Sequence, residues 1–426
     1  MKTQRVITMP RRDFIKAAAT ETAALGALLS SPSAWAQAPG PPATPPNAPV
    51  TASGFLRSIL YTREEVRQWL AGEAFPFAKY SSEFGWLLRS GRFRDGIEGS
   101  TSVYTYGPLD ERITIQYRDQ SCRINTYGDS FTQCHQVSDG ETWQEVLAAH
   151  LQEPVRNFGI GGWSVYQAYL RMLHEEQRVP AGFIILNIYE DDHFRNLDSW
   201  RNIRARKHPA FIEPTLPHVV VNAAEGRLEE RPNPCPTPDS VYRLADFDWV
   251  ENRFKDDFVL KILLAHANAK SANPGQRDGD LLKLATTHGI VTRIDTSEGL
   301  SAAADELHRR SAYFSTERIV EKVEAHARET NKRVLYVLSY PARSVREWVG
   351  NGVRRDQPFV DFMRRRGLPF VDLLDAHAND FTRFNGEIED YLKQLFIGHY
   401  NPRGNFFCAH AVKPRLLEML EPKPLP

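Results

Sequence analysis

Hydrophobic positions follow two alternating periods from residue 122 onward. Short apolar runs typical of buried strands are separated by stretches in which apolar residues recur every three or four positions, as they do on one face of a helix. The predicted strands are 123–127, 155–158, 183–188, 333–339 and 369–374. The predicted helices are 143–151, 165–173, 316–330, 359–365 and a segment after Gly404. This alternation predicts an α/β fold in which helices cover a central parallel sheet.

Two regions depart from this rhythm. Residues 51–120 mix a short predicted helix at 63–70 with strand-like pieces at 102–106 and 113–117, and we expect an N-terminal extension packed on the main domain. Residues 194–300 contain clustered prolines and a predicted hairpin around Glu225-Gly226. We expect them to form an insertion or lid within a domain that spans 121–425.

The first 50 residues read as an export signal followed by a linker. Arg11-Arg12 precedes a small and apolar stretch, and Ala34-Trp35-Ala36 then matches an A-x-A cleavage site. This order predicts a twin-arginine signal peptide at 1–36, recognised by the twin-arginine export machinery, and an extended Pro-rich linker at 37–50. The alternative is a short membrane anchor, although the apolar stretch is short and rich in alanine.

Composition narrows the class of partner. Lys plus Arg and Asp plus Glu both number 53, so no net positive field favours nucleic acid. No later segment reaches about 18 unbroken apolar residues, so we expect no transmembrane segment in the mature protein. With the export signal, we expect the mature protein to be periplasmic or secreted. Four cysteines form no C-x-x-C pair, so we expect no metal; disulfides and buried free thiols both remain open. The sequence indicates no cofactor.

Three sequence blocks carry candidate chemistry. The first is Tyr127-Gly128-Asp129-Ser130, which places a serine at the carboxyl edge of the predicted sheet, where open α/β folds hold their sites. The second is Asn157-Phe158-Gly159-Ile160-Gly161-Gly162, after the second predicted strand. The third is Gly398-His399-Tyr400-Asn401-Pro402-Arg403-Gly404, before the last predicted helix. Histidine is the natural general base near neutral pH.

In their order and spacing, these blocks resemble the conserved motifs of the SGNH (GDSL-type) hydrolases, a family of serine esterases. The resemblance implies a three-layer sandwich with a flavodoxin-like central parallel sheet. It also implies that Ser130 is the nucleophile and His399 its base. The backbone N–H groups of Ser130 and Gly162 would then form the oxyanion hole.

Two positions depart from the pattern of the family. Asp191 takes the place of an asparagine that donates to the oxyanion, and an ionised carboxylate has no proton to donate. Several alternatives remain open. Asp191 could be protonated, turned away from the oxyanion or engaged by a cation. Arg195 or Asn196 could instead supply the hydrogen-bond donor. The family's triad acid is also missing, since Phe396 and Ile397 precede His399.

The sequence therefore predicts an exported carboxylic ester hydrolase that acts on a small-molecule or glycan ester. Three aromatic residues near the predicted site favour a carbohydrate O-acetyl ester as the substrate: Trp163, Tyr166 and Trp200. One alternative is an O-acyltransferase. A second is a catalytically weak ligand-binding or carbohydrate-binding protein on the same fold, because fold alone does not fix function.

Overall fold

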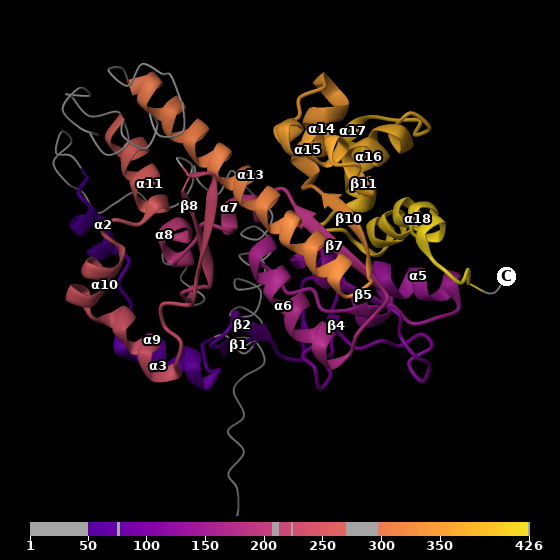
Figure 1. The fold of residues 1–426 in the computed structure, drawn as a ribbon, viewed down its shortest axis with the longest axis horizontal. Coiled ribbons are helices and arrows are strands. Elements are labelled where there is room, and N and C mark those ends of the chain that lie inside the picture. Colours follow the sequence, from indigo (N-terminus) through magenta and orange to yellow (C-terminus); the bar gives the residue numbers. More distant parts are fainter. Residues whose placement is uncertain (1–49, 75–76, 207–212, 223–224, 270–296, 425–426) are drawn as a thin grey trace, which may run out of the picture.

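The computed structural model describes residues 50–424, with gaps at 75–76, 207–212, 223–224 and 270–296 (Figure 1). The signal peptide expected at 1–36 lies outside the described residues, as does the expected linker except for Val50. Among the helices that are described, none is long and apolar enough to cross a membrane.

Five parallel strands form the central sheet. They are β5 (Ile124–Tyr127), β6 (Arg156–Asn157), β7 (Phe183–Tyr189), β10 (Arg333–Ser339) and β11 (Phe370–Asp372), in the spatial order β11-β10-β7-β5-β6. Every residue of β5 and β7 is buried, which agrees with the largely apolar sequence of β7. The predicted α/β fold with a central parallel sheet is confirmed.

The predicted helices of the main domain are all present, one of them at the predicted bounds 143–151 and the others at shifted bounds. They are α5 (Trp143–Leu151), α6 (Val165–Arg178), α13 (Ser297–Glu329), α15 (Gln357–Arg365) and α18 (Pro402–Met419). The sequence predicted only the second half of α13. Its first half packs its buried Leu300, Ala303 and Leu307 against α11 (Phe258–Ala269), in a small core separate from that of the sheet.

Three helices after β10 were not predicted. They are α14 (Ala342–Asn351), α16 (Leu373–Phe381) and α17 (Ile388–Leu395), and they pack on one another beside α18 (Figure 1).

The N-terminal extension consists of two helices and two small hairpins. The helices are α2 (Ala52–Ser58) and α3 (Arg63–Ala71), and the hairpins are β1 (Ala78–Ser81) with β2 (Gly85–Leu88) and β3 (Gly91–Phe93) with β4 (Ser102–Tyr104). The strand predicted at 113–117 is wrong. The N–H groups of Ile115 and Gln116 donate to the Glu145 carboxylate at 2.9 and 2.8 Å instead of joining a ladder.

The insertion holds the predicted hairpin, now observed as β8 (His218–Asn222) paired antiparallel with β9 (Arg227–Arg231). Around it lie α7 (Asp192–Arg195), α8 (Arg201–Ala205), α9 (Pro238–Val241), α10 (Phe247–Phe254) and α11.

All four cysteines are free thiols. Of the two alternatives that the sequence left open, disulfides and free thiols, the structure therefore has free thiols.

Candidate active site

Ser130 lies where β5 turns into the short helix α4 (Ser130–Gln133). Asp129 is the N-cap of this helix, and its carboxylate accepts a hydrogen bond from the Phe131 N–H at 2.9 Å and lies 3.2 Å from the Ser130 Oγ. Both side chains are fully buried. The sequence placed Ser130 at the carboxyl edge of the sheet, and the structure has it there.

His399 meets Ser130 across 269 residues of sequence. Its Nε2 lies 2.8 Å from the Ser130 Oγ, within hydrogen-bonding distance. The loop that carries His399 is fixed on both sides, because Asn401 caps α18 through the Gly404 N–H at 2.9 Å and Phe396 bridges to Tyr400. The fold thus brings together the two residues that the sequence selected as nucleophile and base.

Gln136 occupies the position of the missing triad acid. Its Oε1 accepts from the His399 backbone N–H at 2.8 Å and lies 3.2 Å from His399 Nδ1. An amide oxygen can only accept, so Nδ1 carries the proton and Nε2 is left unprotonated to receive the proton of Ser130. Gly398 makes the approach possible: its φ is +119°, and a Cβ there would lie 2.7 Å from Gln136 Oε1.

The acids nearest to His399 in sequence do not face it. Glu389 pairs with Arg346 on the surface, and Asp390 pairs with Lys393 at 3.6 Å. Neither supplies a triad acid.

The N-terminal extension supports the Gln136 side of the site. The Gln136 N–H donates to the Tyr104 hydroxyl at 2.6 Å, and Gln136 Nε2 donates to the Asp95 carbonyl at 3.2 Å. The Asp95 carboxylate accepts from Tyr104 at 2.7 Å and lies 3.3 Å from His135 Nε2. The extension is therefore part of the site's framework.

The electrostatic surroundings of His399 favour its neutral form. Burial first, and then electrostatic interactions with His135 and Arg195, hold the pKa of His399 well below its ordinary value. The His135 ring lies edge-on to the His399 ring, with 4.9 Å between their centroids. His399 is therefore a weak base that stays unprotonated into the acidic range.

The second glycine block lies directly against the nucleophile segment. A Cβ at Gly159 would come within 2.2 Å of the Gln133 backbone nitrogen, so only glycine fits there. Gly162 has φ of +78°, and within the described ranges its N–H donates to no other group. Its carbonyl accepts from Arg201 Nη2 at 2.9 Å, and the Gly161 carbonyl accepts from Trp86 Nε1 at 3.2 Å. The extension and the insertion thus fix the loop that offers this N–H.

Asp191 is held by two arginines. Arg204 contacts its carboxylate through both terminal nitrogens at 2.8 and 3.1 Å, and Arg195 Nε donates to it at 2.9 Å. Although burial alone would raise it, Arg204 and Arg195 keep the pKa of Asp191 below its ordinary value. Of the alternatives open from the sequence, the geometry matches a carboxylate engaged by cations. An ionised group in this arrangement has no proton for an oxyanion, so the geometry does not support Asp191 as a donor.

Asp191 belongs to a larger buried cluster of alternating charge, which we call the aspartate–arginine cluster. Its members are Asp129, Asp191, Asp192, Asp198, Arg195, Arg201 and Arg204. Arg195 links it to Ser130, since its Nη1 lies 2.8 Å from Asp192 and 3.4 Å from the Asp129 oxygen that faces the Ser130 Oγ. A guanidinium therefore balances the carboxylate beside Ser130.

Sequence reasoning missed Gln136 and the cluster arginines Arg201 and Arg204. A glutamine six residues after a candidate nucleophile is an ordinary loop residue, and nothing in its neighbourhood predicts contact with the C-terminal histidine. The only available signal was the absence of an acid before His399.

In the described part of the chain, no group of three or more His, Cys, Asp or Glu side chains is arranged to hold a metal ion. Comparison of the chain with protein-family models and with curated proteins gave no match in either case.

Proposed function

We propose that this protein is a serine ester hydrolase of the SGNH type. The observation that carries the proposal is the 2.8 Å contact between His399 Nε2 and Ser130 Oγ, with Gln136 on the other ring nitrogen. A nucleophile, a base within hydrogen-bonding reach and a third group that orients the base are the signature of nucleophilic acyl transfer.

The reaction follows from these positions. His399 Nε2 takes the proton of Ser130 as Oγ attacks the ester carbonyl, and the protonated ring then gives that proton to the departing alcohol. The N–H of Gly162, with that of Ser130, would stabilise the oxyanion of the tetrahedral intermediate. Water then releases the acyl group through the same steps.

The sheet supports the family assignment. Numbered along the chain, its strands lie in the order 2-1-3-4-5, and the direction of winding changes between β5 and β7. Ligand sites of open α/β sheets lie outside the carboxyl ends of the strands at such a switch point. Ser130 follows β5, and Arg195 and Asp191 follow β7, so the proposed site has the expected place in a three-layer, flavodoxin-like SGNH fold.

The substrate that we propose is a small acyl ester, such as an O-acetyl group on a carbohydrate. Ser130 and His399 are 0% and 1% exposed, which favours the smallest acyl groups. The aromatic argument for carbohydrate is weaker than the sequence indicated, because Trp163, Tyr166 and Trp200 are buried and present no stacking surface. An acyltransferase acting through the same acyl-enzyme is a variant of this proposal.

A second candidate is a ligand-binding protein with little catalysis. It is favoured by the burial of Ser130 and by an amide in place of the triad carboxylate, which leaves a protonated His399 without a negative partner.

Hydrolysis of p-nitrophenyl acetate by the purified protein and by Ser130→Ala and His399→Ala separates the two candidates. We expect turnover by the wild type and a loss of about 10³-fold or more in both variants. Ser240→Ala, in α9 of the insertion, is the control. Thr132→Val is unsuitable, because Thr132 lies in α4 with Ser130. Equal background rates in all four proteins would favour the binding protein.

A further inference from the structure

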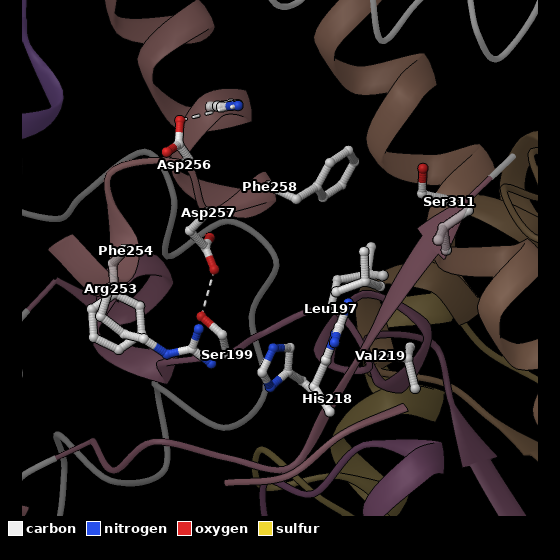
Figure 2. A pocket seen from close by; sticks show the side chains of 14 residues that line it. Leu197, Ser199, His218, Val219, Arg253, Phe254, Asp256, Asp257, Phe258 and Ser311 are labelled. Carbon is white, nitrogen blue, oxygen red and sulfur yellow. Dashed lines mark hydrogen bonds and ion pairs between the residues drawn. The ribbon is translucent and has the colours of Figure 1, made fainter. Parts of the chain in front are cut away.

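A pocket lies in the insertion, away from Ser130. Its volume is about 530 Å³, within the range of small-molecule sites. It is lined by residues of β8, β9, α10, α11 and α13 together with the segment after α7, and none of them belongs to the Ser130 site. Figure 2 shows this pocket with Phe258, Leu197 and Val219 among its apolar side chains.

Several polar groups of the pocket are already paired. The Ser199 hydroxyl donates to the Asp257 carboxylate (Figure 2). The other oxygen of Asp257 accepts from the Leu260 N–H at 3.0 Å. Lys261 lies 3.6 Å from Asp256, and Arg231 pairs with Glu229. In the last two pairs the positive and negative charges offset each other.

Two polar groups of the pocket lack such partners. Arg253 is exposed, and within the described ranges no carboxylate pairs with its guanidinium. The Ser311 hydroxyl is fully buried and has no hydrogen-bond partner among the described residues. A buried hydroxyl without a partner is costly, and a bound ligand would satisfy it.

His218 adds no charge of its own at neutral pH. Burial, and then the charges of Arg253 and Arg231, lower the pKa of His218 to about 4, although its hydrogen bond to the Leu216 carbonyl acts the other way. The positive charges that line the pocket are therefore those of Arg231, Arg253 and Lys261, and among the described residues no carboxylate pairs with Arg253.

We propose that this pocket binds a small amphipathic carboxylate, with its carboxylate on Arg253 and its apolar body against Val219, Phe254 and Phe258. Guanidinium groups pair with carboxylates through two parallel N–H bonds, which suits a single planar anion. The proposal does not depend on esterase activity at Ser130.

Calorimetric titration of the full chain with octanoate, and with 1-octanol as the neutral match, tests the proposal. Octanoate should bind the wild type, 1-octanol should bind at least about tenfold more weakly, and Arg253→Gln should weaken octanoate by about tenfold. Arg243→Gln is the matched control, since Arg243 is exposed in the same insertion but does not line the pocket.

Three results would overturn the proposal: no binding of octanoate by the wild type, equal binding of octanol, or unchanged octanoate affinity in a folded Arg253→Gln protein. The first would leave the pocket without this ligand class. The second would show that the site selects apolar volume and not charge.

Discussion

At the scale of single residues, the site differs from a Ser-His-Asp triad by one group. Gln136 fixes the tautomer of His399 but carries no charge that would stabilise an imidazolium in the proposed reaction. The base is therefore oriented as in a triad and left electrostatically weaker than in one.

The pH dependence of catalysis should report this difference. Because the pKa of His399 is lowered, its neutral form, the one that can act as a base, persists at pH values below the ordinary histidine pKa. As the pH is lowered, kcat/KM should therefore decrease with a midpoint below about pH 6.5. Gln136→Glu should move that midpoint upward, since a carboxylate favours the protonated ring. Gln136→Leu should lower kcat/KM by about 10²-fold. An acid limb at pH 6.5 or above in the wild type would contradict this account of His399.

Asp191 gives a second prediction at this scale, one that concerns stability. Asp191→Asn leaves Arg195 and Arg204 without a shared carboxylate, and because the Asp191 side chain is 21% exposed we expect a loss of about 2 kcal/mol in the free energy of unfolding. Restoring the family's asparagine should not raise kcat.

The sign of its pH dependence follows from the lowered pKa. The contribution of Asp191 is fully present above its unfolded pKa of about 3.9 and is lost progressively as pH falls from there through its lowered folded pKa, so the stability gap between the wild type and Asp191→Asn should be smaller at pH 3 than at pH 7. Urea unfolding at pH 7 and pH 3 measures this. A gap that is absent at pH 7, or that widens in acid, would rule out the ion-paired carboxylate.

At the scale of elements, the extension and the insertion do more than cover the main domain. Arg112, just after the hairpins of the extension, is buried and donates to the carbonyls of Gln133, Cys134 and Val137, the segment that leads from Ser130 to Gln136. It also pairs with Asp139 at 3.0 Å. One guanidinium therefore holds the conformation that places Gln136 beside His399.

Arg112→Lys tests this role, because an ammonium cannot reproduce the fork of a guanidinium. We expect a loss of about 3 kcal/mol in unfolding free energy together with lower kcat. Arg92→Lys, at an exposed position of β3, is the control. A loss below about 1 kcal/mol would mean that the nucleophile segment does not depend on Arg112.

The elements also show what the sequence can and cannot predict. Strands β7 and β10 are continuous apolar runs, and the hairpin β8–β9 has its turn at Glu225-Gly226, so local pattern was enough for each. Local pattern could also select Ser130 and His399, because each lies in a short motif. Gln136 could not be found, since its role depends on a contact across 263 residues. Asp191 and Arg204 are only 13 residues apart, but no periodic pattern of the sequence indicates their pairing.

At the scale of the whole molecule, we propose that the protein acts outside the cytoplasm after export through the twin-arginine route. Replacing both Arg11 and Arg12 with lysine should keep the protein in the cytoplasm, because the paired arginines are the address that the export machinery reads. Fractionation of cells that express each form measures the effect. Unchanged export of the double variant would remove the twin-arginine interpretation.

The central claim is that Ser130 is a nucleophile activated by His399. The most direct measurement is covalent labelling of the full chain with a fluorophosphonate, followed by mass spectrometry of the labelled peptide. The account predicts one adduct, on Ser130, with no labelling of Ser130→Ala and strongly slowed labelling of His399→Ala. An unlabelled wild type, or an adduct on any other residue that persists in Ser130→Ala, would contradict it.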